Sequence, residues 1–116
     1  MTRSWRRSFG CAWSGLVYGL ATQRNLRIHF ALAAIACGLG YWLGLAAVEM
    51  AVLAITIGLV IVAELLNTAV EKVVDLVSPR YHPLAKAAKD TAAGAVLVAA
   101  AVSLVVAGYL FFDRLF

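Results

Sequence analysis

Residues 63–75 read AELLNTAVEKVVD and place acidic side chains directly after an apolar stretch. No charged residue occurs from position 50 to position 63, and then Glu64, Asn67, Glu71 and Asp75 follow at spacings of three, four and four. At about 100° per residue on a helix, the four side chains fall within about 80° of one another and share one face. A carboxylate in or near a bilayer is costly unless it faces a bundle interior, water, a metal or a partner. The pattern therefore predicts a helix whose polar face has a function.

The composition of the whole chain indicates an integral membrane protein. Of its 116 residues, 64% are hydrophobic and 14% are charged. Soluble domains are typically about 45–50% apolar and about 25% charged. The length allows one compact bundle, so we expect an all-α fold that forms a single membrane domain over residues 1–116.

Four helical segments are predicted along this domain. Residues 3–22 form an amphipathic helix with Trp5, Trp13 and a basic polar side, which is typical of a helix lying in the membrane interface. Transmembrane helices follow at about 27–46, 50–77 and 89–113, each long enough to cross a bilayer core. The second should end near Val77, because the Ser78-Pro79 pair disfavours continuation of a helix.

The basic residues predict the orientation of these helices. They cluster before the first span and between the second and third spans, and the turn between the first two spans has none. Such clusters are typical of cytoplasmic segments near anionic headgroups, so we expect the N-terminus inside and the C-terminus outside. The net charge of +4 does not indicate a nucleic-acid partner, because the chain has no basic groove with interleaved aromatic residues. His29, at the start of the first span, is interpreted as a polar residue at headgroup depth rather than a metal ligand.

Polar residues of the second and third predicted helices and of the hinge at residues 23–25 converge near one side of the membrane. Carboxylates with an Asn are hard oxygen ligands suited to Mg²⁺, and a neighbouring Lys can neutralise phosphate charge. A carboxylate in partly apolar surroundings can serve as a general base. Together these groups are suited to phosphoryl transfer onto a substrate that resides in the membrane.

Three other interpretations of the polar face stay open at this point. The side chains could form only an interhelical network of ion pairs and hydrogen bonds, which would hold the bundle together. A small proton-coupled transporter or channel could use Glu64 as an intramembrane carboxylate, although the acids gather at one interface instead of marking a path across. The chain could also be a non-catalytic assembly subunit, but that interpretation does not explain why Glu64, Asn67 and Glu71 share one helix face.

The motif Glu64-Leu-Leu-Asn67-Thr-Ala-Val-Glu71-Lys-Val-Val-Asp75, with His82-Pro83 and Ala88-Lys89-Asp90, resembles the prokaryotic diacylglycerol kinase family. The resemblance covers nearly the whole chain. The segments HPLAKAAKD and TAAGAVL are more similar to the undecaprenol kinase branch. The resemblance implies an ATP- and Mg²⁺-dependent lipid kinase of the bacterial inner membrane. It further implies a homotrimer, a cytoplasmic active site, and undecaprenol or diacylglycerol as the substrate.

The resemblance also implies roles for individual residues. Glu64 would be the general base on the lipid hydroxyl, Asn67 would help to position the reacting groups, and Glu71 would hold the metal bound to the nucleotide phosphates. Lys89 and Asp90 would contact the nucleotide, and Asp75 would support the cytoplasmic edge of the site. The substrate-binding set is Glu64, Asn67 and Trp13, and the nucleotide-binding set is Glu71, Lys89, Asp90, Asn67 and Gln23.

One position departs from the family pattern. The family commonly has a Glu at the hinge before the first span, where it joins the residue equivalent to Glu71 in holding metal. The matching residue here is Gln23. Its amide oxygen can ligate a metal but brings no negative charge, so we expect weaker Mg²⁺ affinity or a shifted metal position.

Overall fold

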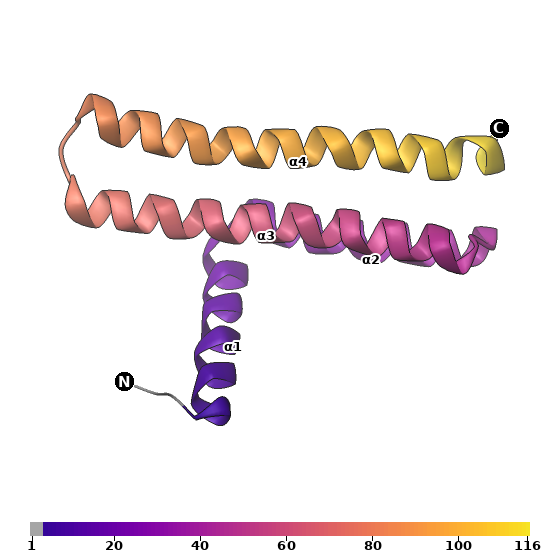
Figure 1. Ribbon diagram of the computed structural model, residues 1–116, viewed down its shortest axis with the longest axis horizontal. Helices are drawn as coiled ribbons and strands as arrows, with labels where there is room; N and C mark the ends of the chain where they lie inside the picture. Colours follow the sequence, from indigo (N-terminus) through magenta and orange to yellow (C-terminus); the bar gives the residue numbers. More distant parts are fainter. Residues whose placement is uncertain (1–3) are drawn as a thin grey trace.

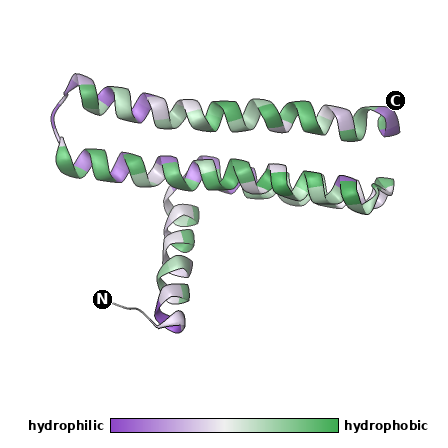
Figure 2. Cartoon of the chain, in the orientation of Figure 1, coloured by the Kyte–Doolittle hydropathy of each residue, from purple (hydrophilic) through white to green (hydrophobic). Residues whose placement is uncertain are grey.

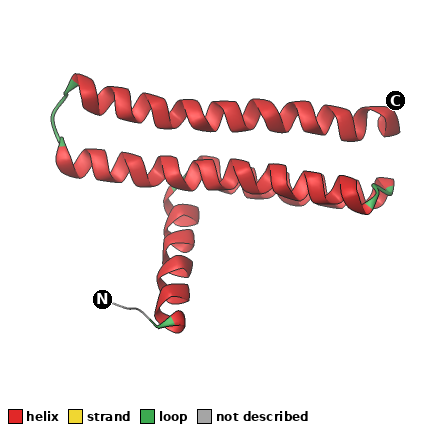
Figure 3. Ribbon diagram, viewed as in Figure 1, coloured by secondary structure: helices red, strands yellow, loops and turns green. Residues whose placement is uncertain are grey.

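The computed structural model describes residues 4–116, and this part of the chain is helical throughout apart from short connections (Figures 1 and 3). The helices are α1 (Trp5–Thr22), α2 (Arg24–Leu43), α3 (Ala47–Val77) and α4 (Pro83–Leu115). Arg3, the first residue of the predicted interfacial helix, lies outside the described residues. The all-helical architecture with three long apolar helices is as predicted.

The three long helices run alongside one another, and α1 extends away from them crosswise (Figure 1). Helix α3 is the centre of the arrangement, because it packs against both α2 and α4. The buried face of α3 consists of residues at spacings of three and four, which are Leu53, Thr56, Val60, Glu64 and Thr68. The hydroxyls of Thr56 and Thr68 are satisfied within the helix, because they donate to the carbonyls of Val52 and Glu64.

Each of the three long helices is long and apolar enough to cross a membrane. Figure 2 shows hydrophobic residues along their length. Large apolar side chains stay exposed on their outer faces, among them Ile55, Leu97 and Leu104. Exposed apolar surface on this scale is unfavourable in water and is expected of helices surrounded by lipid or by other membrane helices.

The junction between α1 and α2 is a single residue, Gln23, in extended conformation. Arg27 holds the turn closed, because its Nη1 donates to the carbonyls of Leu20 and Ala21 at the end of α1. Leu26 packs beneath this turn and is fully buried. These contacts fix the crosswise direction in which α1 leaves the bundle.

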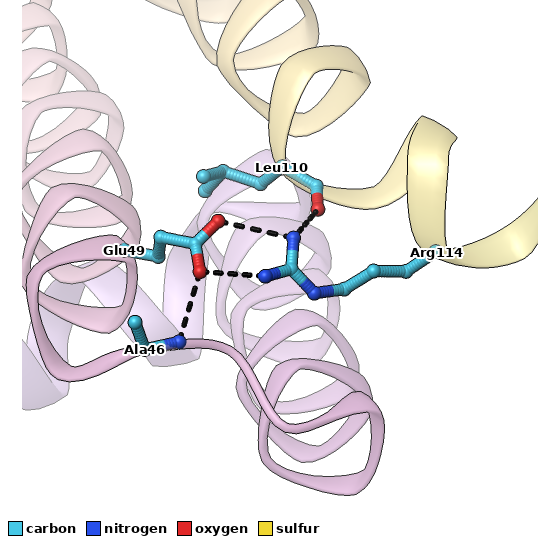
Figure 4. A network of polar contacts seen from close by, with 4 residues as sticks. All are labelled: Ala46, Glu49, Leu110 and Arg114. Carbon is cyan, nitrogen blue, oxygen red and sulfur yellow. Dashed lines mark hydrogen bonds and ion pairs between the residues drawn. The ribbon is translucent and has the colours of Figure 1, made fainter.

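The opposite end of the bundle has its own small core and an ion pair. Leu53, Leu110 and Phe111 form a buried apolar cluster between α3 and α4. Beside it, Glu49 at the start of α3 accepts from the backbone N–H of Ala46 and binds both Nη atoms of Arg114 from α4 (Figure 4). Arg114 also donates to the carbonyl of Leu110. This network joins the start of α3 to the end of α4.

The helix bounds differ from the predicted spans 27–46, 50–77 and 89–113 at every end except the C-terminal end of α3, and two of these differences have a clear local cause. Helix α2 stops at Leu43, because Gly44 adopts φ 76°, the left-handed conformation that ends helices. Helix α4 begins at Pro83, several residues early, since proline is well suited to the first turn and His82 Nδ1 accepts from the Leu84 N–H. Helix α3 ends at Val77, next to Ser78-Pro79.

Candidate active site

The polar face of α3 divides into three groups of contacts, each made by a different pair of residues. Glu64 is 4% exposed and faces α2. One turn further on, the Asn67 amide donates to Glu71 Oε1 at 3.3 Å. At the end of the face, Asp75 binds Lys89 of α4. The four residues predicted to share one face therefore connect α3 with both of its neighbours.

Glu64 lies against His29, with His29 Nε2 3.3 Å from Glu64 Oε1. The two atoms form an ion pair when the imidazole is protonated. The sequence interpretation treated His29 as a headgroup-level residue and did not pair it with Glu64. The spacing of the two residues from the α2–α3 turn could have predicted this contact. His29 lies fifteen residues before Gly44, and Glu64 lies eighteen residues after Ala46. An antiparallel α2–α3 hairpin therefore brings them to a similar depth.

A cavity of about 420 Å³ opens beside this pair. Helix α4 supplies an apolar wall, and the polar groups come from α2 and α3. Its lining residues are Asn25, Ile28, His29, Glu64, Asn67, Ala93, Val96, Leu97 and Ala100. A buried carboxylate beside an apolar wall is suited to a substrate that has one reactive polar group on a hydrocarbon body.

Asn67 connects this cavity with a second groove between α3 and α4. The second groove has a volume of about 360 Å³ and is apolar along almost its whole length. Asn67 lines both. Its Oδ1 atom is buried and has no hydrogen-bond partner among the described residues. A buried amide oxygen without a partner is costly, so this atom is available to a ligand.

Positive charge gathers at the end of the bundle where α3 meets α4. A groove of about 380 Å³ there is lined by residues that include Asp75, Arg80, His82, Lys86 and Lys89. Lys89 Nζ lies 2.5 Å from Asp75 Oδ1, and Lys86 Nζ lies 2.5 Å from Asp90 Oδ2. The predicted nucleotide residues Lys89 and Asp90 are thus each paired with an opposite charge. Three cationic side chains and a histidine in one groove can attract an anion such as a phosphate.

Comparison with known proteins assigns the chain to a family. The model of the prokaryotic diacylglycerol kinase family matches residues 10–111, which is nearly the whole chain. The chain belongs to this family. The predicted family is therefore confirmed, and the polar α3 face lies within the matched residues.

Three curated members of the prokaryotic diacylglycerol kinase family align over most of the chain. A diacylglycerol kinase from Synechocystis is 53% identical over 89% of this chain. An undecaprenol kinase from Bacillus subtilis is 40% identical over 94% of this chain, and a diacylglycerol kinase from Escherichia coli is 31% identical over 85%. The chain spans 59% of the length of the Synechocystis protein, 89% of the B. subtilis protein and 81% of the E. coli protein.

These relatives support the expectation of a lipid kinase. The chain is more similar to the undecaprenol kinase than to the E. coli diacylglycerol kinase, in keeping with the predicted branch. The Synechocystis protein, at higher identity, carries the name diacylglycerol kinase. The names of the relatives therefore refer to two different lipid alcohols.

The cavity that holds Glu64 and Asn67 leaves out the other predicted site residues, which are Glu71, Lys89, Asp90, Gln23 and Trp13. Gln23 forms the junction between α1 and α2, and its amide nitrogen contacts the Thr22 hydroxyl at 3.4 Å. Trp13 is 68% exposed on α1. Neither lines the cavity that holds Glu64 and Asn67. The roles of Gln23 in nucleotide and metal binding and of Trp13 in lipid binding stay predictions.

The side-chain oxygen atoms of Glu71 and Asn67 are of the kind that bind Mg²⁺. Over residues 4–116, no group of three or more His, Cys, Asp or Glu side chains is placed to hold a metal ion. Magnesium usually binds one or two carboxylates and completes its shell with water and substrate phosphates, so a dedicated protein cage is not required. The Glu71 carboxylate and the unpartnered Asn67 Oδ1 are donors of the right kind. These residues fit a metal ion that arrives with a nucleotide.

Proposed function

We propose that this protein transfers a phosphoryl group from ATP to the hydroxyl of a membrane lipid alcohol, giving the lipid phosphate and ADP. The alcohol is undecaprenol or diacylglycerol. Family membership supports the reaction class. The observation that carries the proposal is a carboxylate, Glu64, that is 4% exposed and lines an otherwise mostly apolar cavity.

Glu64 is the proposed general base. The hydroxyl of the lipid gives its proton to the Glu64 carboxylate while its oxygen forms a bond to the γ-phosphorus. The bond from that phosphorus to the bridging oxygen breaks, and ADP leaves with the electron pair. The apolar wall from α4 accommodates the hydrocarbon part of the lipid and limits the access of water, which would otherwise compete as the acceptor.

The nucleotide is proposed to bind along the remainder of the polar α3 face. Glu71 holds the metal of the metal–nucleotide complex, with Asn67 beside it and Gln23 as a further candidate ligand. When bound with the nucleotide, Mg²⁺ would neutralise phosphate charge. Lys89 contributes a cation toward the phosphates, and Asp90 helps to hold the nucleotide. The groove that contains Lys89 supports this placement, because it also contains Arg80 and Lys86.

The membrane arrangement belongs to the same proposal. The site lies on the cytoplasmic side of a bacterial inner membrane, the N-terminus is inside and the C-terminus is outside. α1 lies in the interface with Trp13 near the lipid substrate. The protein works as a homotrimer, and the exposed apolar faces of α2, α3 and α4 are available to lipid and to neighbouring copies.

A lipid phosphorylation assay tests the function. Purified protein in lipid bicelles, given Mg²⁺ and γ-labelled ATP, should phosphorylate undecaprenol, diacylglycerol or both. The Glu64→Gln variant should lose about 10²–10⁴-fold in kcat, the usual contribution of a general base. Asp113→Asn, a carboxyl change at the opposite end of the bundle, is the matched control and should retain activity. No labelled lipid from either alcohol would refute the kinase, and an active Glu64→Gln variant would refute the assignment of the base.

A further inference from the structure

His29 is the side chain that contacts the Glu64 carboxylate. Its Nε2 atom lies 3.3 Å from Glu64 Oε1, and its side chain is 22% exposed. Among the residues that line the cavity, His29 and Glu64 are the ones with ionisable side chains. The pair joins α2 to α3 at the position where the proposed reaction takes place.

The neighbouring polar groups on α3 are engaged elsewhere. The Thr68 hydroxyl donates to the backbone carbonyl of Glu64 and not to its carboxylate. The Asn67 amide donates to Glu71. Asn25 also lines the cavity, but among the described residues the polar contact of the Glu64 carboxylate is with His29.

A general base on a flexible side chain needs such orientation. A misplacement of about 1 Å in a reacting group can lower a rate about a hundredfold. Glu64 has two carboxylate oxygens, and a contact on Oε1 leaves Oε2 free. Hydrogen bonds of catalytic groups commonly tighten when a substrate binds, so a separation of 3.3 Å is within the range that a small rotation of the imidazole can close.

We propose that His29 is a positioning residue for Glu64. The Nε2–H of its imidazole donates to Oε1 and directs Oε2 toward the hydroxyl of the lipid. The proton of that hydroxyl passes to Oε2, and His29 exchanges no proton in the step. This inference rests on the proposed lipid kinase function, and it assigns a role to a residue outside the polar face from which that function was argued.

Steady-state kinetics of three variants test this role. His29→Ala should lower kcat about tenfold or more while the KM values for lipid and ATP change little, because the base is displaced and binding is not. His29→Gln should restore most of the lost kcat, since its amide can also donate to Oε1. Ile35→Ala, an exposed apolar position on the same helix, is the matched control and should retain wild-type rates. Wild-type kcat in His29→Ala, or a His29→Gln variant as slow as His29→Ala, would overturn the proposal.

Nitrogen-15 NMR of labelled histidine tests the contact without relying on turnover. The chain has two histidines, and His29→Gln assigns the His29 signals in bicelles. Glu64→Gln should shift the His29 Nε2 resonance and leave that of His82 in place, whereas Glu71→Gln should shift the His29 resonance little. An unmoved His29 resonance in Glu64→Gln would overturn the pairing. Failure of wild-type protein to phosphorylate either lipid would instead overturn the proposed function, and with it the catalytic role of the pair.

Discussion

Lys89 on α4 binds Asp75 on α3, with Nζ 2.5 Å from Oδ1. The two side chains are 42% and 58% exposed, and they line the cationic groove at the end of the bundle. Exposed ion pairs contribute little to stability because solvent screens them and the side chains lose entropy. We therefore expect this ion pair to matter for the position of the Lys89 ammonium group more than for the stability of the fold.

Replacement of Lys89 should separate nucleotide binding from stability. Lys89→Met should raise the KM for ATP about tenfold or more, because a cation beside the proposed phosphate site is lost, while the melting temperature changes little. Asp75→Asn removes the pair but keeps the cation, so its effect on the KM should be smaller. Kinetics with varied ATP and thermal unfolding of both variants make the comparison. Equal increases in KM would show that the pair, and not the cation, matters.

Gln23 should limit the affinity for Mg²⁺. Gln23→Glu restores a negative charge at a candidate metal ligand, so we expect half-maximal activity at a lower Mg²⁺ concentration than in the wild type. Glu71→Gln removes a charge and should shift the requirement in the opposite direction. Gln23→Ala serves as the control for loss of the amide. A Mg²⁺ dependence that is the same in Gln23→Glu and wild type would exclude Gln23 from the metal site.

The helices could be predicted from the sequence because the features that form and end a helix lie close together in the chain. The apolar runs, the Ser78-Pro79 stop and the polar face of α3 each depend on residues close together in the chain. Two helix ends were displaced by single-residue effects. Gly44 ended α2 through its positive φ, and Pro83 began α4 at the position where its missing N–H costs nothing.

The site was predictable only along one helix. Glu64, Asn67 and Glu71 share a face by periodicity alone, whereas the contact of Glu64 with His29 depends on the depth at which two helices pack. That depth is fixed by the α2–α3 turn, whose length the hydropathy pattern does not define. The ion pair between Glu49 and Arg114 joins residues 65 positions apart, and no sequence pattern linked them.

The Glu49–Arg114 ion pair should stabilise the end of the bundle opposite the proposed site. Glu49→Ala should lower the melting temperature by more than Arg114→Ala, because it leaves the Ala46 N–H at the start of α3 without its acceptor. Arg114→Ala also loses a bond to the Leu110 carbonyl, but that carbonyl lies inside α4, where carbonyls accept within the helix. Neither variant should change the KM for ATP. Thermal unfolding of both single variants and of the double variant in detergent measures the coupling between Glu49 and Arg114. Additive losses in the double variant would indicate that the two residues do not interact.

Gly19 should be required for α1 to pack against the bundle. A Cβ atom at this position would lie 2.9 Å from Leu26 Cδ2 and 3.2 Å from Leu65 Cδ2, and Leu26 is fully buried. Gly15, one turn earlier on the same helix, has open space around it. Both substitutions by Val place the same side chain in a helix, so helix propensity cancels in the comparison.

We therefore expect Gly19→Val to be less stable than Gly15→Val by about 1–3 kcal/mol, the usual cost of overpacking. Chemical unfolding in mixed micelles measures this difference. Because α1 is joined to α2 by Gln23 alone, displacement of α1 should also lower the rate of lipid phosphorylation in Gly19→Val. Equal stability of the two variants would mean that the Gly19 contact with Leu26 and Leu65 does not hold α1 in place.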